Sequence, residues 1–177
     1  PTNTGRDQSN MKALITGVHG AVGSYMEEFI EKEHPDVKVR GTARGGCEHE
    51  KPHYVMDLRE EEQVYKVIKD EPFDVIFHFA CDPDVRKSFE EPVAILDNNI
   101  LSTAHLFEAV RKHSPQTKII LASTAEVYGR CSDGKPVTEL APLDPDNPYA
   151  VSKVTQDLLA RTYFNCYGLQ IVRMRLF

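Results

Sequence analysis

A tyrosine and a lysine four residues apart form the most informative pair in this chain. Tyr149 and Lys153 lie in the segment Tyr-Ala-Val-Ser-Lys, and residues with this spacing share one face of a helix. A lysine ammonium beside a phenol favours the ionised phenol, so Tyr149 could act as a base near neutral pH. The same spacing also arises by chance on surface helices. A Ser-Thr-Ala-Glu segment at 123–126 and three regularly spaced glycines favour the catalytic interpretation.

The glycines at positions 17, 20 and 23 predict a phosphate-binding turn. The preceding residues Met11–Thr16 have the pattern of a short buried strand, and Val22–Glu33 has that of an amphipathic helix. Glycine at such a turn lets the backbone approach a ligand closely, and a dinucleotide pyrophosphate can bind at the helix N-terminus. The spacing differs from the Gly-x-Gly-x-x-Gly fingerprint, so a turn with only a structural role is the alternative.

Length and composition describe a protein with a substantial core and no sign of nucleic-acid binding. The chain has 177 residues, of which 41% are hydrophobic, and no apolar run that could span a membrane. The net charge of −6 disfavours nonspecific binding to nucleic acid. The cysteines form no Cys-x-x-Cys pair and no secretory signal precedes the first predicted strand, so we expect a cytoplasmic protein. The histidines lack metal-ligand spacing, so we expect no metal.

Predicted strands alternate with predicted helices along the chain. The strands are Met11–Thr16, Val37–Ala43, Tyr54–Asp57, Asp74–Ala80, Lys118–Ser123 and Gln170–Phe177, and the helices are Val22–Glu33, Glu60–Asp70, Pro92–Lys112 and Tyr149–Tyr167. This order predicts an α/β fold, a doubly wound, Rossmann-like parallel sheet with strand order 3-2-1-4-5-6. The ends of strands one, two, four and five should line a cofactor crevice. Residues 1–10 are predicted to be a flexible tail, and 11–177 a dinucleotide-binding domain.

Five segments together resemble the extended short-chain dehydrogenase/reductase family, also called the NAD-dependent epimerase/dehydratase family. They are Thr16–Ser24, Asp57-Leu58, Ala122–Gly129, Asn147–Lys153 and Val172–Phe177. Their order and spacing match the family from Met11 to Phe177. Within the family the chain is most similar to nucleotide-sugar 4,6-dehydratases. Leu14–Gly17, Gly23–Tyr25 and Val39–Arg44 are similar to the GDP-mannose branch.

The resemblance implies catalytic roles for four residues. Tyr149 would remove the proton from a sugar 4-hydroxyl as hydride passes from C4 to the nicotinamide. Lys153 would lower the pKa of Tyr149 and bind the nicotinamide ribose, and Thr124 would orient the same hydroxyl. Glu126 would take the C5 proton and help to expel the 6-hydroxyl as water, after which hydride returns to C6. Thr124 could instead be an ordinary strand-end hydroxyl, and Glu126 could merely cap or solvate a turn.

The resemblance also implies a set of cofactor-binding residues. They are Gly17, His19, Gly20, Ala21, Val22, Gly23, Arg44, Asp57, Leu58, Phe79 and Ala80, together with Tyr149 and Lys153. Arg44 favours NADP over NAD, because no acidic residue ends the second predicted strand and an arginine there suits the 2′-phosphate. The alternatives are a solvated Arg44 and an N-cap role for Asp57.

The chain departs from the family pattern at its end and at two inner positions. Relatives continue beyond the position of Phe177 with a second domain that binds the nucleotide-sugar. We therefore expect the substrate domain to be absent and the isolated chain to be inactive. Inside the chain, Cys81 replaces a small residue and Ser102 replaces a glycine.

Three classes of function remain open. The first is an NADP-dependent nucleotide-sugar 4,6-dehydratase with a GDP-mannose-like substrate. The second is a related enzyme, either a 4-keto-6-deoxy-sugar reductase, a nucleotide-sugar 4-epimerase or a UDP-glucuronate decarboxylase. The third is a non-catalytic NADP-binding module. We expect the nucleotide-sugar as partner, a homo-oligomer in the full-length form, and neither nucleic acid nor membrane as partner.

Overall fold

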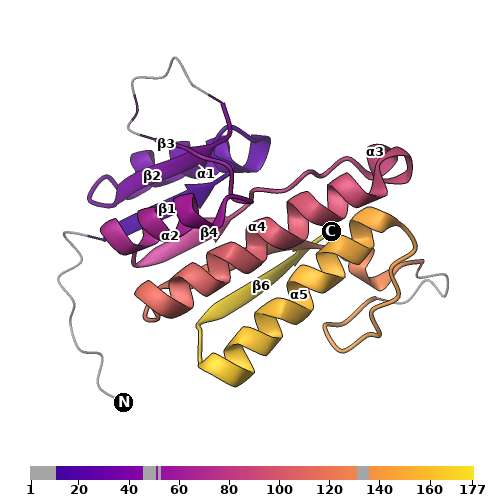
Figure 1. Ribbon diagram of the computed structural model, residues 1–177. Helices are drawn as coiled ribbons and strands as arrows, with labels where there is room; N and C mark the ends of the chain where they lie inside the picture. Colours follow the sequence, from indigo (N-terminus) through magenta and orange to yellow (C-terminus); the bar gives the residue numbers. More distant parts are fainter. Residues whose placement is uncertain (1–10, 46–50, 52, 131–135) are drawn as a thin grey trace.

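A six-stranded parallel sheet runs through the chain (Figure 1). The computed structural model describes residues 11–45, 51, 53–130 and 136–177. The strands are β1 (Lys12–Thr16), β2 (Lys38–Ala43), β3 (Tyr54–Val55), β4 (Val75–His78), β5 (Lys118–Thr124) and β6 (Ile171–Leu176). Their order is β3-β2-β1-β4-β5-β6 and every pairing is parallel, which confirms the predicted fold and strand order. The predicted tail at 1–10 lies outside the described residues.

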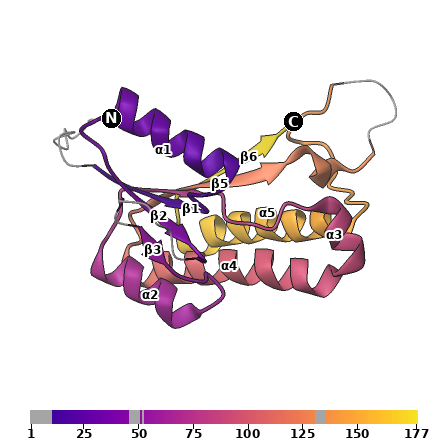
Figure 2. The ribbon, with the colours of Figure 1, turned by 90° about the horizontal axis from the view of Figure 1, so that it is seen from above.

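Helices cover both faces of the sheet (Figure 2). Helix α1 (Ala21–Glu33) lies on one face, and α2 (Glu61–Asp70), α4 (Pro92–His113) and α5 (Pro148–Tyr167) lie on the other. The sequence did not predict α3 (Val85–Glu90) or a 3₁₀ helix at Ala125–Tyr128, because both are too short to show helical periodicity. No helix in the described ranges is long and apolar enough to cross a membrane.

The largest part of the core fills the space between the sheet and the layer of α2, α4 and α5. Its members include Leu14, Ile76, Leu106, Phe107, Val110, Ile119 and Leu121, each at most 1% exposed. Side chains of a strand alternate between the two faces, so every second residue of β5 points into this layer. The tightly packed core provides a rigid support for the edge of the sheet at which the strands end.

Strands β3 and β4 each end two residues earlier than predicted, and this brings their last predicted residues to the edge of the sheet. Strand β3 stops at Val55, so Met56, Asp57 and Leu58 leave the sheet. Strand β4 stops at His78, so Phe79 and Ala80 also leave it. Since all strands are parallel, these segments lie at the same edge of the sheet as the turn after β1. Strand β1 pairs with β2 on one side and with β4 on the other, so the strand order changes direction at this point.

Candidate cofactor and catalytic site

The turn between β1 and α1 requires its glycines. Gly17 has φ +71°, and a Cβ there would lie 2.9 Å from the Cα of Ala80. A Cβ on Gly23 would lie 2.2 Å from the carbonyl oxygen of Gly17, so any side chain would push α1 away from the turn. Gly20 precedes α1, and no side chain caps the helix. The first N–H groups of α1 therefore have no side-chain partner at its N-terminus, where an anion is favoured.

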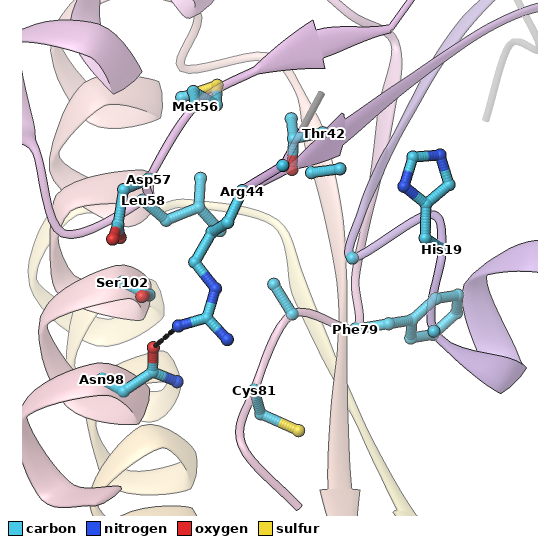
Figure 3. A pocket seen from close by; sticks show the side chains of 15 residues that line it. His19, Thr42, Arg44, Met56, Asp57, Leu58, Phe79, Cys81, Asn98 and Ser102 are labelled. Atoms are coloured by element: carbon cyan, nitrogen blue, oxygen red, sulfur yellow. Dashed lines mark hydrogen bonds between the residues drawn. The ribbon is translucent and has the colours of Figure 1, made fainter. Parts of the chain in front are cut away.

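A cavity of about 430 Å³ opens beside this turn (Figure 3). Its walls are formed by the segments that end or follow β1, β2, β3 and β4, and by two residues of α4. The lining residues are Gly17, His19, Gly20, Thr42, Ala43, Arg44, Gly45, Met56, Asp57, Leu58, Phe79, Ala80, Cys81, Asn98 and Ser102. Within the described ranges no group of three or more His, Cys, Asp and Glu side chains could hold a metal ion.

Eight predicted cofactor residues line this cavity, namely Gly17, His19, Gly20, Arg44, Asp57, Leu58, Phe79 and Ala80. Ala21, Val22 and Gly23 do not, because they form the first turn of α1 beyond the wall. Tyr149 and Lys153 lie outside it as well. Residues after β3 line the cavity, whereas the end of β5 lies outside its lining.

Seven lining residues were missed from the sequence. Thr42, Ala43, Gly45, Met56 and Cys81 are direct chain neighbours of predicted residues, so extending each motif by one or two positions would have found them. Asn98 and Ser102 lie on α4, one turn apart, and have no such neighbour. Helical periodicity identifies the buried face of α4 but does not show which residues of that helix border a cavity.

Arg44 extends across the cavity from the end of β2 (Figure 3). Its Nη1 donates a hydrogen bond to Oδ1 of Asn98 on α4, with a donor–acceptor distance of 3.1 Å. Arg44 is exposed at this wall and is held there by Asn98. A guanidinium held at a cavity wall is a suitable partner for a phosphate group.

Asp57 contributes a carboxylate to the cavity wall. Arg59 donates to it from Nη2 at 2.7 Å and from its backbone N–H at 2.9 Å. The hydrogen bonds from Arg59 hold the pKa of Asp57 below its usual range against the opposing effect of burial, and Arg44 adds to the lowering. Asp57 is not the N-cap of α2, because that helix begins at Glu61 and Glu60 occupies the cap position.

The four predicted catalytic residues converge at the end of β5. Thr124 ends that strand, Glu126 lies in the 3₁₀ helix, and Tyr149 and Lys153 lie on α5. Tyr149 is 8% exposed and Lys153 4%, and the Lys153 Nζ lies 6.0 Å from the centre of the Tyr149 ring. Lys153 donates to the carbonyl oxygen of Ala122 at 2.9 Å.

Burial shifts the pKa values of Tyr149 and Lys153 in opposite directions. It raises the pKa of Tyr149, Cys81 and Glu126 raise it further, and a hydrogen bond with Thr124 opposes them. Burial lowers the pKa of Lys153, and contact with the Cys81 thiol opposes this. The Lys153 ammonium donates to a backbone carbonyl in this structure, and its predicted effect on the pKa of Tyr149 stays a prediction. Cys81 connects this catalytic cluster to the cavity wall.

Glu126 is held by the residue that caps the catalytic helix. Asn147 donates from Nδ2 to Glu126 Oε2 at 2.9 Å, and its Oδ1 accepts from the backbone N–H of Ala150 at 2.8 Å as the N-cap of α5. A single amide side chain therefore fixes the start of α5 and the Glu126 carboxylate together. The arrangement combines a buried phenol, an ammonium, a hydroxyl and a carboxylate, which are groups suited to moving protons beside a cavity.

Comparisons with known proteins show the family to which the chain belongs. A family model described as GDP-mannose 4,6 dehydratase matches residues 14–177. A GDP-mannose 4,6-dehydratase of Yersinia enterocolitica is 32% identical over 177 residues, covering 89% of this chain and 47% of that protein. A UDP-glucose 4-epimerase of Halalkalibacterium halodurans is 28% identical over 170 residues, covering 94% of this chain and 50% of that protein. The chain thus spans about half the length of the relatives it matches.

A solved structure of a relative has a fold similar to that of this chain. The crystal structure of the UDP-glucose 4-epimerase of Thermus thermophilus in complex with NAD superimposes with a TM-score of 0.84 at 29% sequence identity. The match covers 93% of this chain and 54% of that one. The described sheet and its helices therefore correspond to about half of that enzyme.

Proposed function

Because the chain belongs to the GDP-mannose 4,6-dehydratase family of extended short-chain dehydrogenases/reductases, we propose that it is the cofactor-binding part of an NADP-dependent nucleotide-sugar 4,6-dehydratase. Family membership leaves a choice between dehydratase and 4-epimerase, since relatives of both kinds match. The observation that carries the proposal is the position of the Glu126 carboxylate, which Asn147 holds at the start of the helix that carries Tyr149. A dehydratase needs a second base at C5, whereas an epimerase does not.

The residues present fit a dinucleotide. The turn between β1 and α1 has no room for a Cβ at Gly17 or Gly23, as a backbone cradle for a pyrophosphate would require. Arg44 supplies a positive group at the cavity wall, and no acidic residue ends β2 in its place. These features support NADP rather than NAD, because an acid at the end of β2 would bind the ribose 2′-hydroxyl and repel a 2′-phosphate.

Each catalytic residue then has a defined task. Tyr149 removes the proton of the sugar 4-hydroxyl, which Thr124 orients by its hydroxyl group. The bound nicotinamide would accept the hydride from C4 and later return it to C6. Lys153 must turn from the Ala122 carbonyl toward the phenol to favour its ionised form. Glu126 takes the proton from C5 and delivers a proton to the departing 6-hydroxyl.

GDP-mannose is the proposed substrate class, on the strength of the matching family model and the Yersinia relative. A protein of the relatives' length that contains this chain would be incubated with GDP-mannose, dTDP-glucose or UDP-glucose and NADP. We expect a product one water lighter than GDP-mannose by mass spectrometry. A product of unchanged mass but altered C4 configuration would show a 4-epimerase instead.

A further inference from the structure

Arg44 is the first member of a chain of hydrogen bonds that reaches the catalytic helix. Arg44 Nη1 donates to Asn98 Oδ1 at 3.1 Å, and Asn98 Nδ2 donates to Asn99 Oδ1 at 3.0 Å. Asn99 Nδ2 donates to Ser152 Oγ at 3.0 Å. The Ser152 hydroxyl donates to the backbone carbonyl of Tyr149 at 2.6 Å. The chain joins the end of β2, two residues of α4 and the first turn of α5.

The direction of this chain is set by Arg44. A guanidinium carries only donors, so the Asn98 atom that faces Arg44 must be the amide oxygen. The amide nitrogen of Asn98 then faces Asn99, which must present its own oxygen at that contact. The nitrogen of Asn99 is left for Ser152, whose proton goes to the Tyr149 carbonyl. The donor–acceptor directions along the chain, from Arg44 to the Tyr149 carbonyl, are therefore mutually consistent.

Asn99 holds Asn98 in place from behind. Asn99 is fully buried, its Oδ1 also accepts from the backbone N–H of Asp82 at 2.7 Å, and its Nδ2 donates to the Asp82 carbonyl at 3.1 Å. Rotating the Asn99 amide would bring donor against donor and acceptor against acceptor at these contacts. Asn98 is partly exposed at the cavity wall. It therefore contacts both Arg44 in the cavity and the buried Asn99 behind it.

We propose that Asn98 is a specificity-determining residue for the cofactor. It holds the Arg44 guanidinium at the position of the 2′-phosphate, and its own amide is oriented by Asn99, which is bonded in turn to Ser152 of α5. The inference rests on the proposed use of NADP. A long arginine side chain loses rotamer freedom when it binds a phosphate, and a side chain already held in place loses less. Asn98 is suited to this role because a neutral oxygen holds Arg44 without neutralising its charge.

Two substitutions at position 98 test the role. Asn98→Asp keeps the shape but pairs a carboxylate with Arg44 and places it against the phosphate. It should raise the Kd for NADP about tenfold or more relative to the Kd for NAD. Asn98→Ala removes the hold alone, and should raise the same ratio about threefold. Both dissociation constants would be measured by calorimetry on the same preparations, and retained NAD binding shows that each variant is folded.

Two controls make the test specific. Asn165→Asp introduces the same chemical change at an exposed site near the end of α5, and the ratio of dissociation constants should not change. If Asn98 acts through Arg44, Asn98→Ala should have no further effect on the ratio in an Arg44→Ala background. The inference would be overturned if Asn98→Ala left the ratio of dissociation constants unchanged. It would also be overturned if Asn98→Ala changed that ratio by the same factor with and without Arg44→Ala. Tighter binding of NAD than NADP by the unmodified protein would instead contradict the proposed cofactor.

Discussion

Tyr149 and Lys153 are both almost completely buried, although each must change its charge or partner during the proposed reaction. Burial disfavours the charged form of each side chain, so the phenol keeps its proton more strongly and the ammonium holds its proton less strongly than in water. A phenol with a raised pKa is a poor base until a positive group approaches it. We infer that the site becomes reactive when Lys153 turns toward the phenol.

Replacing Tyr149 by phenylalanine tests its proposed role as the base. Tyr149→Phe removes one oxygen and leaves the ring in place, so we expect kcat to fall by about two to four orders of magnitude. The Kd for NADP should change by less than about threefold, because Tyr149 does not line the cavity. Tyr167→Phe, at a site 54% exposed on the same helix, is the matched control. Turnover of Tyr149→Phe at the normal rate would refute the proposed mechanism.

Reversing the charge at Arg44 tests the cofactor assignment. Arg44→Glu replaces a favourable contact with the 2′-phosphate by a repulsive one, and a charge-assisted hydrogen bond contributes about 1.5 to 3 kcal/mol. NADP binding should therefore weaken by about tenfold or more, whereas NAD binding should change much less. Equal losses for both nucleotides in equilibrium titrations would mean that Arg44 does not contact the 2′-phosphate.

The sequence predicted eight residues of the cavity wall, because they lie in motifs whose spacing is tied to the ends of strands. Asn98 was not predicted, since its role depends on an amide contact between α4 and the end of β2, 54 residues apart along the chain. Lys153 was predicted on the correct helix, but its hydrogen bond to the carbonyl of Ala122 was not predicted. That partner belongs to the backbone, which carries no signal in the sequence.

At the scale of elements, the sequence predicted the six strands and the four longer helices of the described residues, because apolar segments alternate with longer helix-forming segments along the chain. The predicted ends of β3 and β4 were two residues too late, because apolar residues continue past the last paired position into the cavity wall. Apolar side chains at a cavity wall and at a buried strand look alike in a sequence.

Helix α5 is anchored to β6 by a buried ion pair, and this anchoring is testable. Asp157 is fully buried and accepts from Arg173 at 2.6 Å and from Arg175 at 2.9 Å. Asp157→Asn should lower the free energy of unfolding by on the order of 3 kcal/mol, because both arginines lose their charged partner. Asp146→Asn, at an exposed pair with Arg130, should change it by less than about 1 kcal/mol. Urea titrations would compare the variants, and equal effects would show that the buried pair does not anchor α5.

The same pair implies a dependence of stability on pH. Burial alone would raise the pKa of Asp157, but hydrogen bonds from Arg175 and Arg173 outweigh it and hold the pKa below its usual range. The stabilisation is therefore present above the pKa of an unfolded aspartate, about 4, and is lost as the pH falls through the lowered value. Asp157→Asn should lose less stability than the unmodified protein over that acidic range. Parallel stability curves for the two proteins would contradict this account.

At the scale of the whole molecule, the proposed cofactor cavity and the proposed catalytic cluster lie at one edge of the sheet, within a chain about half as long as its relatives. The groups of a nucleotide-sugar remote from C4 normally supply the binding energy that positions the reacting hydroxyl. We therefore expect the 177-residue chain alone to bind NADP in a calorimeter but to show little turnover. Rapid turnover by this chain would mean that the sugar binds within the described residues.

The most direct test of the central claim is to follow the hydrogen at C4 of the sugar. GDP-mannose carrying deuterium at C4 would be incubated with NADP and a protein of the relatives' length that contains this chain. If the nicotinamide takes hydride from C4 and returns it to C6 of the same sugar, mass spectrometry and NMR should find a product lacking one water, with deuterium at C6. A product that retains its oxygen and carries deuterium at C4 would contradict the dehydratase assignment.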